Sequence, residues 1–356
     1  MPKLVPVLKL VLMECLTMSM IFRFSKCLIA LSACAMLSAQ AGEAFVGKTF
    51  PARDTLAPQA EESPDAKACL VGLIWKPVEF EVTVEAGSDP AMEGLVRFPS
   101  PKPNGVAQND RVALEWYAAK DDSGNVIDAP AIVVVHESGS KMEVGRIFAK
   151  ALHAQGLHAF MIQLPFYGAR KPAGFKPDGR QVEATMRQGI VDVRRARDAV
   201  AALPHVDKTN IAVQGTSLGG FVTATTAGLD RGFASVHIMV AGGDLYELVA
   251  NGQREAGKLR EMLAEAGYTG DKLRDLFAAV EPLRLAHRLD PQTTWMYSAT
   301  RDQVVPPAHA NKLAEAAKLT DDHHTQLWAD HYTGIIYVPV VVDSIAKHVK
   351  ATQSTQ

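Results

Sequence analysis

Residues 210–220 read Asn-Ile-Ala-Val-Gln-Gly-Thr-Ser-Leu-Gly-Gly and carry the clearest structural signal in the chain. The run 210–214 predicts a buried strand, and the small and apolar residues 217–229 predict a helix directly after it. A turn this tight holds its central residue in a strained conformation. The residues two before and two after it must lack bulk so that strand and helix can pass closely. Gly215 and Gly219 meet that need.

The residue types in this turn exclude two other functions of a glycine-rich turn. A dinucleotide-binding fingerprint needs glycine where Ser217 stands, and a phosphate-binding P-loop needs Gly-Lys-Ser or Gly-Lys-Thr at the start of the helix. In a chain with 26 glycines a G-x-S-x-G can arise by chance, and a serine that merely caps a helix would look the same. The position of the motif between a strand and a helix favours a nucleophile at Ser217.

The rest of the chain predicts an α/β fold with a doubly wound, mostly parallel sheet. Continuous apolar runs that alternate with helical periodicity are typical of parallel strands buried on both faces. The predicted strands cover residues 131–135, 158–164, 210–214, 235–240, 293–298 and 325–328, and the predicted helices cover residues 142–155, 181–203, 217–229, 307–319 and 334–349.

Two regions depart from this alternation. Residues 78–84, 94–98 and 112–118 are short strand patterns separated by turn residues, and they predict antiparallel strands at the start of the sheet. Residues 244–290 form an insertion before the penultimate strand, with helical spacing at 255–266 and 271–280. We expect this insertion to be either a small cap over a pocket or a pair of helices packed on the sheet.

With this fold and motif the sequence resembles the α/β-hydrolase superfamily, in its serine esterase and dienelactone-hydrolase-like branch, over residues 78–350. The resemblance implies a catalytic triad in the chain order serine, acid, histidine. Asp302 follows the strand 293–298 and fits the acid. His331 follows the last strand and fits the base. The resemblance thus implies that Ser217, Asp302 and His331 are catalytic.

Each assignment has an alternative. Asp302 could instead be a turn or cap residue before Pro306-Pro307, and some lipase-like members place the acid where Asp244 stands, at the end of an earlier strand. Of the 11 histidines, His323 and His324 precede the last strand and look solvent-facing, and His136 belongs to another loop. His331 is the expected base.

The resemblance also implies an oxyanion hole. One donor would be the backbone N–H of Leu218, and the second would be the N–H of Ser138, with Glu137 as the alternative. Glu137 stands where the family commonly has glycine, and it would either disfavour anionic substrates or form a salt bridge. Tyr167 would line the substrate pocket or be a packed loop aromatic, with Arg170 paired to a buried carboxylate.

The amino-terminal residues 1–41 predict a signal peptide. Arg23 and Lys26 precede an apolar stretch that is too short to span a membrane and that ends in Ala39-Gln40-Ala41, as signal peptidase requires. Met18 or Met20 is the more natural start, so we expect that the gene start is over-extended. The sequence Leu31-Ser32-Ala33-Cys34 resembles a lipobox, and lipidation at Cys34 is the alternative that would attach the protein to a membrane.

The remaining chain is expected to be a flexible lead-in at 42–70 and one hydrolase domain at 71–356. Lys and Arg number 37 against 39 Asp and Glu, so no strong field attracts nucleic acid. Only Cys69 of the 4 cysteines follows residue 41, so disulfides are not expected within the domain. No metal-binding spacing occurs, and we expect neither a metal nor a cofactor.

These features predict an exported serine hydrolase, periplasmic or secreted, that cleaves carboxylic esters through an acyl-enzyme intermediate. The substrate would be a small-molecule or carbohydrate-linked ester. A serine peptidase or amidase on the same fold is the main alternative, and a non-catalytic binding protein is the other. A dehalogenase is disfavoured because that chemistry uses an aspartate where Ser217 stands.

Overall fold

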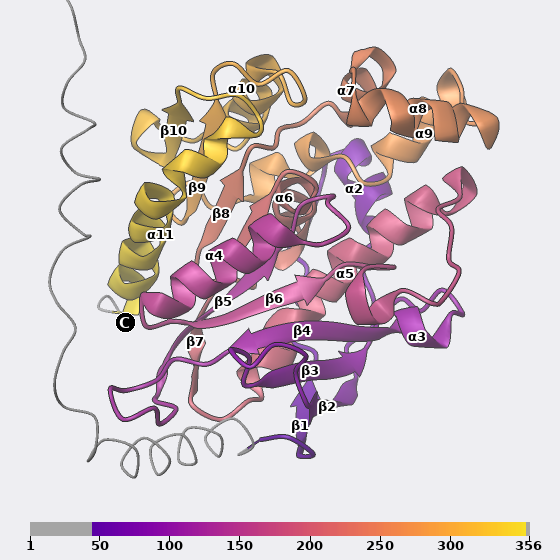
Figure 1. Cartoon of the computed structure of the whole chain (residues 1–356). Coiled ribbons are helices and arrows are strands. Elements are labelled where there is room, and N and C mark those ends of the chain that lie inside the picture. Colours follow the sequence, from indigo (N-terminus) through magenta and orange to yellow (C-terminus); the bar gives the residue numbers. More distant parts are fainter. Residues whose placement is uncertain (1–44, 354–356) are drawn as a thin grey trace, which may run out of the picture. The chain divides into compact units, whose positions relative to one another are not determined.

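The computed structural model describes residues 45–353, which contain a single mixed β-sheet (Figure 1). Within these residues the strand order is β1-β2-β3-β4-β6-β5-β7-β8-β9-β10. Neighbours in this order are antiparallel from β1 to β6 and parallel from β6 to β10. The sequence predicts the antiparallel strands β2 to β4 and the parallel strands, but it does not predict β1. The strands are β1 (Thr49–Arg53), β2 (Glu79–Glu85), β3 (Gly94–Pro99), β4 (Arg111–Tyr117), β5 (Ala129–Val135), β6 (His158–Gln163), β7 (Val206–Thr216), β8 (Val236–Met239), β9 (Thr294–Ala299) and β10 (His324–Leu327).

Helices connect the strands and cover both faces of the sheet. The bounds of α4, α5, α6 and α10 lie within a few residues of the predicted ones, and α11 begins later than predicted because residues 333–337 form a 3₁₀ helix. The helices α2 and α3 were not predicted. The helices outside the insertion are α2 (Pro64–Val71), α3 (Ala107–Asp110), α4 (Glu143–Ala154), α5 (Val182–Ala201), α6 (Leu218–Asp230), α10 (Pro307–Ala316) and α11 (Val338–Gln353). In the part of the chain that the structure describes, no helix is both long and apolar enough to cross a membrane.

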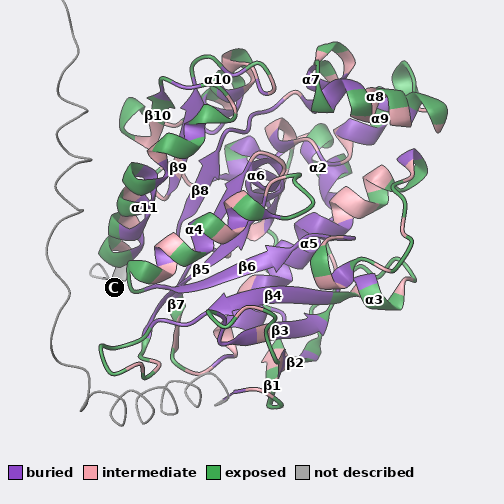
Figure 2. Cartoon of the chain, viewed as in Figure 1, coloured by how far each residue is buried: buried purple, intermediate pink, exposed green. Residues whose placement is uncertain are grey.

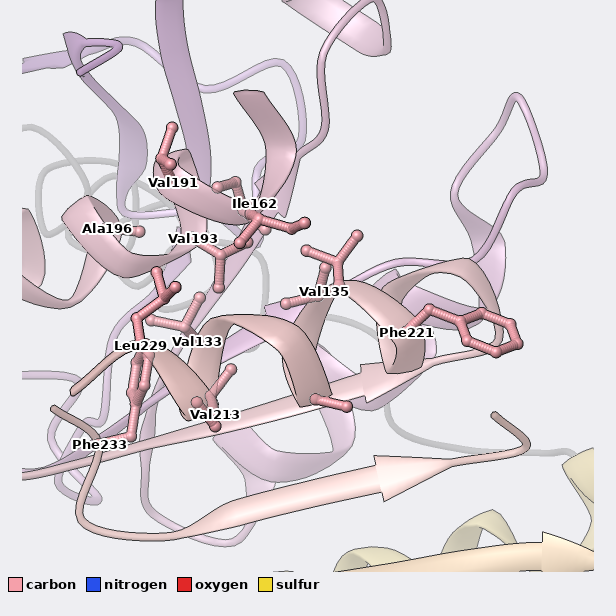
Figure 3. Close-up of a cluster of buried hydrophobic side chains, with 14 of the residues drawn as sticks. Val133, Val135, Ile162, Val191, Val193, Ala196, Val213, Phe221, Leu229 and Phe233 are labelled. Atoms are coloured by element: carbon pink, nitrogen blue, oxygen red, sulfur yellow. The ribbon is translucent and has the colours of Figure 1, made fainter. Parts of the chain in front are cut away.

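The central strands are buried because each face packs against its own layer of helices (Figure 2). Alternate side chains of β5 point to opposite faces. Val133 and Val135 belong to the core formed with α5 and α6, part of which Figure 3 shows, whereas Ile132 and Val134 belong to the core formed with α4 and α11. The doubly wound parallel sheet is therefore confirmed.

The segment before β2 differs from the prediction of a flexible lead-in at 42–70. It contains β1, which extends the antiparallel part of the sheet, and α2, whose Cys69 is fully buried. Burial raises the pKa of the Cys69 thiol to about 11, so the thiol is protonated and unreactive at neutral pH. The folded part thus begins well before residue 71, and the prediction of the boundary was wrong.

Asp54 fixes this segment to α5. Its carboxylate receives two hydrogen bonds from Arg195, at 2.9 and 2.6 Å, and others from the Trp75 indole and the Val78 amide. Both members of the ion pair are almost completely buried. The pairing joins residues far apart in sequence, which is why composition and periodicity did not predict it.

The insertion between β8 and β9 consists of α7 (Leu245–Asn251), α8 (Glu255–Glu265) and α9 (Asp271–Ala278). The last two helices were predicted, and α7 was not. Leu263, Leu273 and Leu276 belong to the core on the α5 and α6 face, so the insertion is packed into the domain.

We predict that Asp54→Ala lowers the free energy of unfolding by about 3–5 kcal/mol, because it leaves the Arg195 guanidinium buried without its partner. Urea denaturation of the purified protein measures the change. Glu62→Ala, an exposed carboxylate of the same segment, is the control and should change stability by no more than about 0.5 kcal/mol. Equal effects of the two substitutions would contradict a structural role for the segment.

Candidate active site

Ser217 occupies the turn between β7 and α6 with a strained backbone. Its φ is 54° and its ψ is −116°, a combination that a residue with a side chain rarely adopts. The turn is held by hydrogen bonds on both sides: the Ser217 N–H donates to Met239 O of β8 at 2.9 Å, and the Ser217 carbonyl accepts from Gly220 and Phe221. The side chain is thereby presented at the carboxyl end of the parallel strands.

The glycines on either side of Ser217 are required by close approach. A Cβ on Gly215 would lie 2.1 Å from Gly219 O, and a Cβ on Gly219 would lie 2.1 Å from Val135 O. Both contacts are with backbone atoms, which cannot move aside without shifting a strand or a helix. The steric prediction from the sequence is confirmed at both positions.

The structure brings Ser217, His331 and Asp302 together. Ser217 Oγ lies 3.0 Å from His331 Nε2, and His331 Nδ1 lies 2.7 Å from Asp302 Oδ2. A carboxylate can only accept, so Nδ1 carries the proton and Nε2 is left to accept from the serine hydroxyl. The three side chains form one continuous chain of hydrogen bonds.

Asp302 is buried at the end of β9 and is held by its own loop. Its Oδ1 accepts from the amides of Val304 and Val305, both at 2.8 Å, while Oδ2 faces the imidazole. The sequence left Asp302 as either a turn residue before Pro306-Pro307 or the partner of His331, and in the structure it is both. The alternative acid, Asp244, pairs with Lys312, and no contact in the described part of the chain joins it to His331.

The loop that carries His331 follows β10 and is ordered by its neighbour Asp330. The Asp330 carboxylate accepts from the amides of Tyr332 and Thr333, at 2.9 and 2.8 Å. The Tyr332 hydroxyl donates to Glu255 at the start of α8, at 2.9 Å. The sequence analysis missed this link to the insertion, because nothing in the spacing of the two residues indicates it.

The other histidines have different partners. His136 is fully buried and accepts from the Leu164 amide, and burial lowers its pKa to about 4, so it stays neutral at pH 7. His323 and His324 are half-buried rather than solvent-facing, and they bind Thr294 O and Ser298 Oγ. The prediction that His323 and His324 face the solvent was wrong.

The proposed oxyanion residues lie on one cavity with the serine. Ser138, Leu218 and Tyr167 line it together with Ser217, and the Tyr167 hydroxyl donates to Ser138 O at 3.0 Å. The first N–H groups of a helix have no partner within that helix, which makes the amide of Leu218, the first residue of α6, a suitable donor. The roles of Ser138 and Leu218 as donors remain predictions.

Glu137, in the loop after β5, and Arg170, in the segment after β6, both have structural partners. Glu137 accepts from the amides of Val144 and Gly145 at the start of α4, so its carboxylate caps a helix rather than forming a salt bridge. Arg170 is fully buried against Asp192 at 2.6 Å, as one of the two hypotheses for this loop expected.

The cavity above Ser217 has a volume of about 550 Å³. The loop after β6 and the beginning of α5 supply one wall, and α7 and α8 of the insertion supply the other. The insertion therefore borders the candidate site as well as packing on the domain. Among residues 45–353, no group of three or more His, Cys, Asp or Glu side chains is placed to hold a metal ion.

Comparisons with known proteins agree with this architecture. The sequence model of the prolyl oligopeptidase family matches residues 183–334, a range that includes Ser217, Asp302 and His331. A search of curated protein sequences finds no match.

Solved structures resemble the chain at low sequence identity. The acetyl xylan esterase from Paenibacillus sp. R4 has a TM-score of 0.58 at 15% identity, over 83% of this chain and 97% of its own. Acetyl xylan esterase 1 from Thermoanaerobacterium sp. JW/SL YS485 has a TM-score of 0.56 at 14% identity, over 82% and 96%. A puromycin hydrolase has a TM-score of 0.51 at 13% identity, over 78% and 46%. The likenesses confirm the α/β-hydrolase fold, and together with the family match they support serine hydrolase chemistry.

We predict that Asp302→Asn slows reaction of Ser217 with a fluorophosphonate by about 10³- to 10⁴-fold, because an amide can donate to Nδ1 and so favours the wrong imidazole tautomer. The labelling rate of the folded variant measures this. Asp244→Asn is the matched control and should leave the rate nearly unchanged. A larger loss in Asp244→Asn than in Asp302→Asn would transfer the role of acid to Asp244.

Proposed function

We propose that this α/β-hydrolase is an exported enzyme that cleaves carboxylic esters with Ser217 as nucleophile, His331 as general base and acid, and Asp302 as the orienting carboxylate. The observation that carries the proposal is the continuous chain of hydrogen bonds from Ser217 Oγ through both nitrogens of His331 to the buried Asp302. Such a relay is what a weakly nucleophilic hydroxyl needs in order to attack a carbonyl carbon.

The reaction proceeds in two halves. Ser217 Oγ attacks the ester carbonyl while its proton passes to His331 Nε2, and the negative charge moves to the carbonyl oxygen. When the tetrahedral intermediate collapses, the C–O bond to the alcohol breaks, and His331 returns the proton to the leaving alkoxide. Water then attacks the acyl-enzyme by the same route, releasing the carboxylic acid and restoring the serine hydroxyl.

The developing oxyanion requires donors that are in place before the reaction. In this proposal they are the backbone N–H groups of Leu218 and Ser138. Leu218 begins α6, so the positive end of the helix dipole also faces the new charge. The hydrogen bond from Tyr167 to Ser138 O holds the second loop at the cavity.

An ester is favoured as the substrate because two acetyl xylan esterases share the fold over almost their whole length. A peptide or amide is the second candidate, which the match to the prolyl oligopeptidase family supports. Both would use the same three residues. The partner is a small-molecule or carbohydrate-linked ester rather than nucleic acid, in line with a net charge of −2.

Export rests on the sequence of residues 1–41, which lie outside the described residues. In this proposal the chain is cut after Ala41 and the enzyme is periplasmic or secreted. Lipidation at Cys34 would instead attach it to a membrane.

We predict that a fluorophosphonate labels the purified protein and that Ser217→Ala abolishes the labelling. Ser140→Ala, which removes another serine hydroxyl from the same cavity, should retain it. Hydrolysis of p-nitrophenyl butanoate without hydrolysis of aminoacyl p-nitroanilides would support an esterase, and the reverse would support a peptidase. Folded protein that neither labels nor hydrolyses any of these substrates would exclude both.

A further inference from the structure

We propose that the substrate carries a bulky apolar group, an alkyl chain of medium length or an aromatic ring, on one side of the scissile ester. The inference rests on the proposed function and specifies its substrate. It derives from the cavity that begins at Ser217, whose volume and walls suit a much larger and less polar group than acetyl.

The walls of the cavity are predominantly apolar. Phe166 and Phe175 of the loop after β6, together with Met186 of α5, form one side, and Leu259 and Met262 of α8 form the other. Leu259 and Met262 are only half-buried, although they are hydrophobic. A bound apolar group would cover the surface that these side chains leave open to water.

The aromatic wall is built with strain. Phe166 has a φ of 65°, which is unusual for a bulky residue, and its ring stacks on Phe175 with centroids 4.0 Å apart and planes 3° apart. The Phe166 amide donates to the side chain of the fully buried Asn109 at 2.8 Å, and Asn109 donates to Gln188 at 2.7 Å. The surrounding polar network thus holds the backbone in a conformation that it would otherwise leave, and backbone strain of this kind is typical of ligand-binding sites. The result is a rigid, flat apolar surface in the cavity.

The volume of the cavity favours a large substrate group over a small one. A volume of about 550 Å³ falls within the range of about 300–1,000 Å³ that is usual for sites binding drug-sized ligands. An acetyl group would leave most of it filled with water against apolar walls. Each further methylene buried there is worth about a fourfold gain in kcat/KM.

The charged residues on the cavity favour a neutral group. Lys171 and Glu255 are exposed, and Glu255 already accepts from Tyr332. Asp178 is half-buried, and its carboxylate already accepts from the Arg180 amide and pairs with the Arg180 guanidinium. None of the three side chains is therefore a buried, unpaired partner for a charge in the cavity. A carboxylate or ammonium group among the phenylalanines would lose its hydration without gaining a partner.

The test compares p-nitrophenyl acetate, butanoate and octanoate with the full chain, and ethyl acetate with octyl acetate. We expect kcat/KM to rise by at least about tenfold from the smallest to the largest member of one series. A gain in the first series places the apolar group on the acyl side, and a gain in the second places it on the alcohol side. Either result supports the inference.

Variants of α8 test whether this cavity is responsible. Leu259→Trp places an indole in the cavity and should lower kcat/KM for the favoured long ester by at least about tenfold while nearly preserving turnover of the short one. Ala264→Trp introduces the same side chain at an exposed position of the helix and should change neither. Met262→Trp serves as a second filling variant, and fluorophosphonate labelling reports that each variant is folded.

Three outcomes would overturn the inference and can be told apart. If the protein labels and hydrolyses esters, but kcat/KM is flat or falls with chain length in both series, the apolar substrate is excluded and the esterase proposal stands. If kcat/KM rises with chain length but the filling variants lose short and long esters equally, the apolar group does not bind in this cavity, and the inference fails because it derives from the cavity. If folded protein neither labels nor hydrolyses any ester, the proposed function fails and this inference fails with it.

Discussion

The close passage of β7 and α6 is the constraint on which the candidate site depends. A Cβ on Gly215 of β7 would collide with the carbonyl oxygen of Gly219 in α6, and a Cβ on Gly219 would collide with the carbonyl oxygen of Val135 in β5. The tight turn between β7 and α6 holds Ser217 in its strained conformation, with its hydroxyl oxygen 3.0 Å from His331 Nε2. Because β7, β9 and β10 are parallel, the loops that follow them emerge at the same edge of the sheet. The loops after β9 and β10 thereby bring Asp302 and His331 to Ser217.

The sequence was informative wherever local pattern and sheet geometry decide the outcome. Buried parallel strands have continuous apolar runs, so the strands from β5 to β10 could be predicted along the chain. The resemblance to the α/β-hydrolase superfamily, in which the acid and the histidine follow later strands, then predicted that Asp302 and His331 would lie at the carboxyl ends of the strands with Ser217. The amino-terminal segment was mispredicted because its stability comes from a distant pairing. Asp54 finds Arg195 in α5, and no window of sequence contains both.

The cavity was beyond prediction for a related reason. Phe166, Met186 and Leu259 come from three separate segments, and each would pass for an ordinary core residue in its own stretch of sequence. Only the folded chain shows that they face a common space. Helix α5 carries buried charged residues whose partners also lie far away in the sequence. Asp192 pairs with Arg170 in the segment after β6, Arg194 pairs with Asp230 at the end of α6, and Arg195 pairs with Asp54 just after β1. Such pairs specify an arrangement more than they stabilise it.

The hydrogen bond between Tyr332 and Glu255 connects the loop that carries His331 to the helix that forms a wall of the cavity. Tyr332 adjoins His331, and Glu255 begins the helix that walls the cavity. A displacement of α8 away from the cavity would lengthen this contact unless the loop after β10 moved with the helix, and the loop that carries His331 would then lose one of its hydrogen bonds. In the proposed reaction, the position of α8 and the position of the imidazole would therefore be coupled through the Tyr332 hydroxyl.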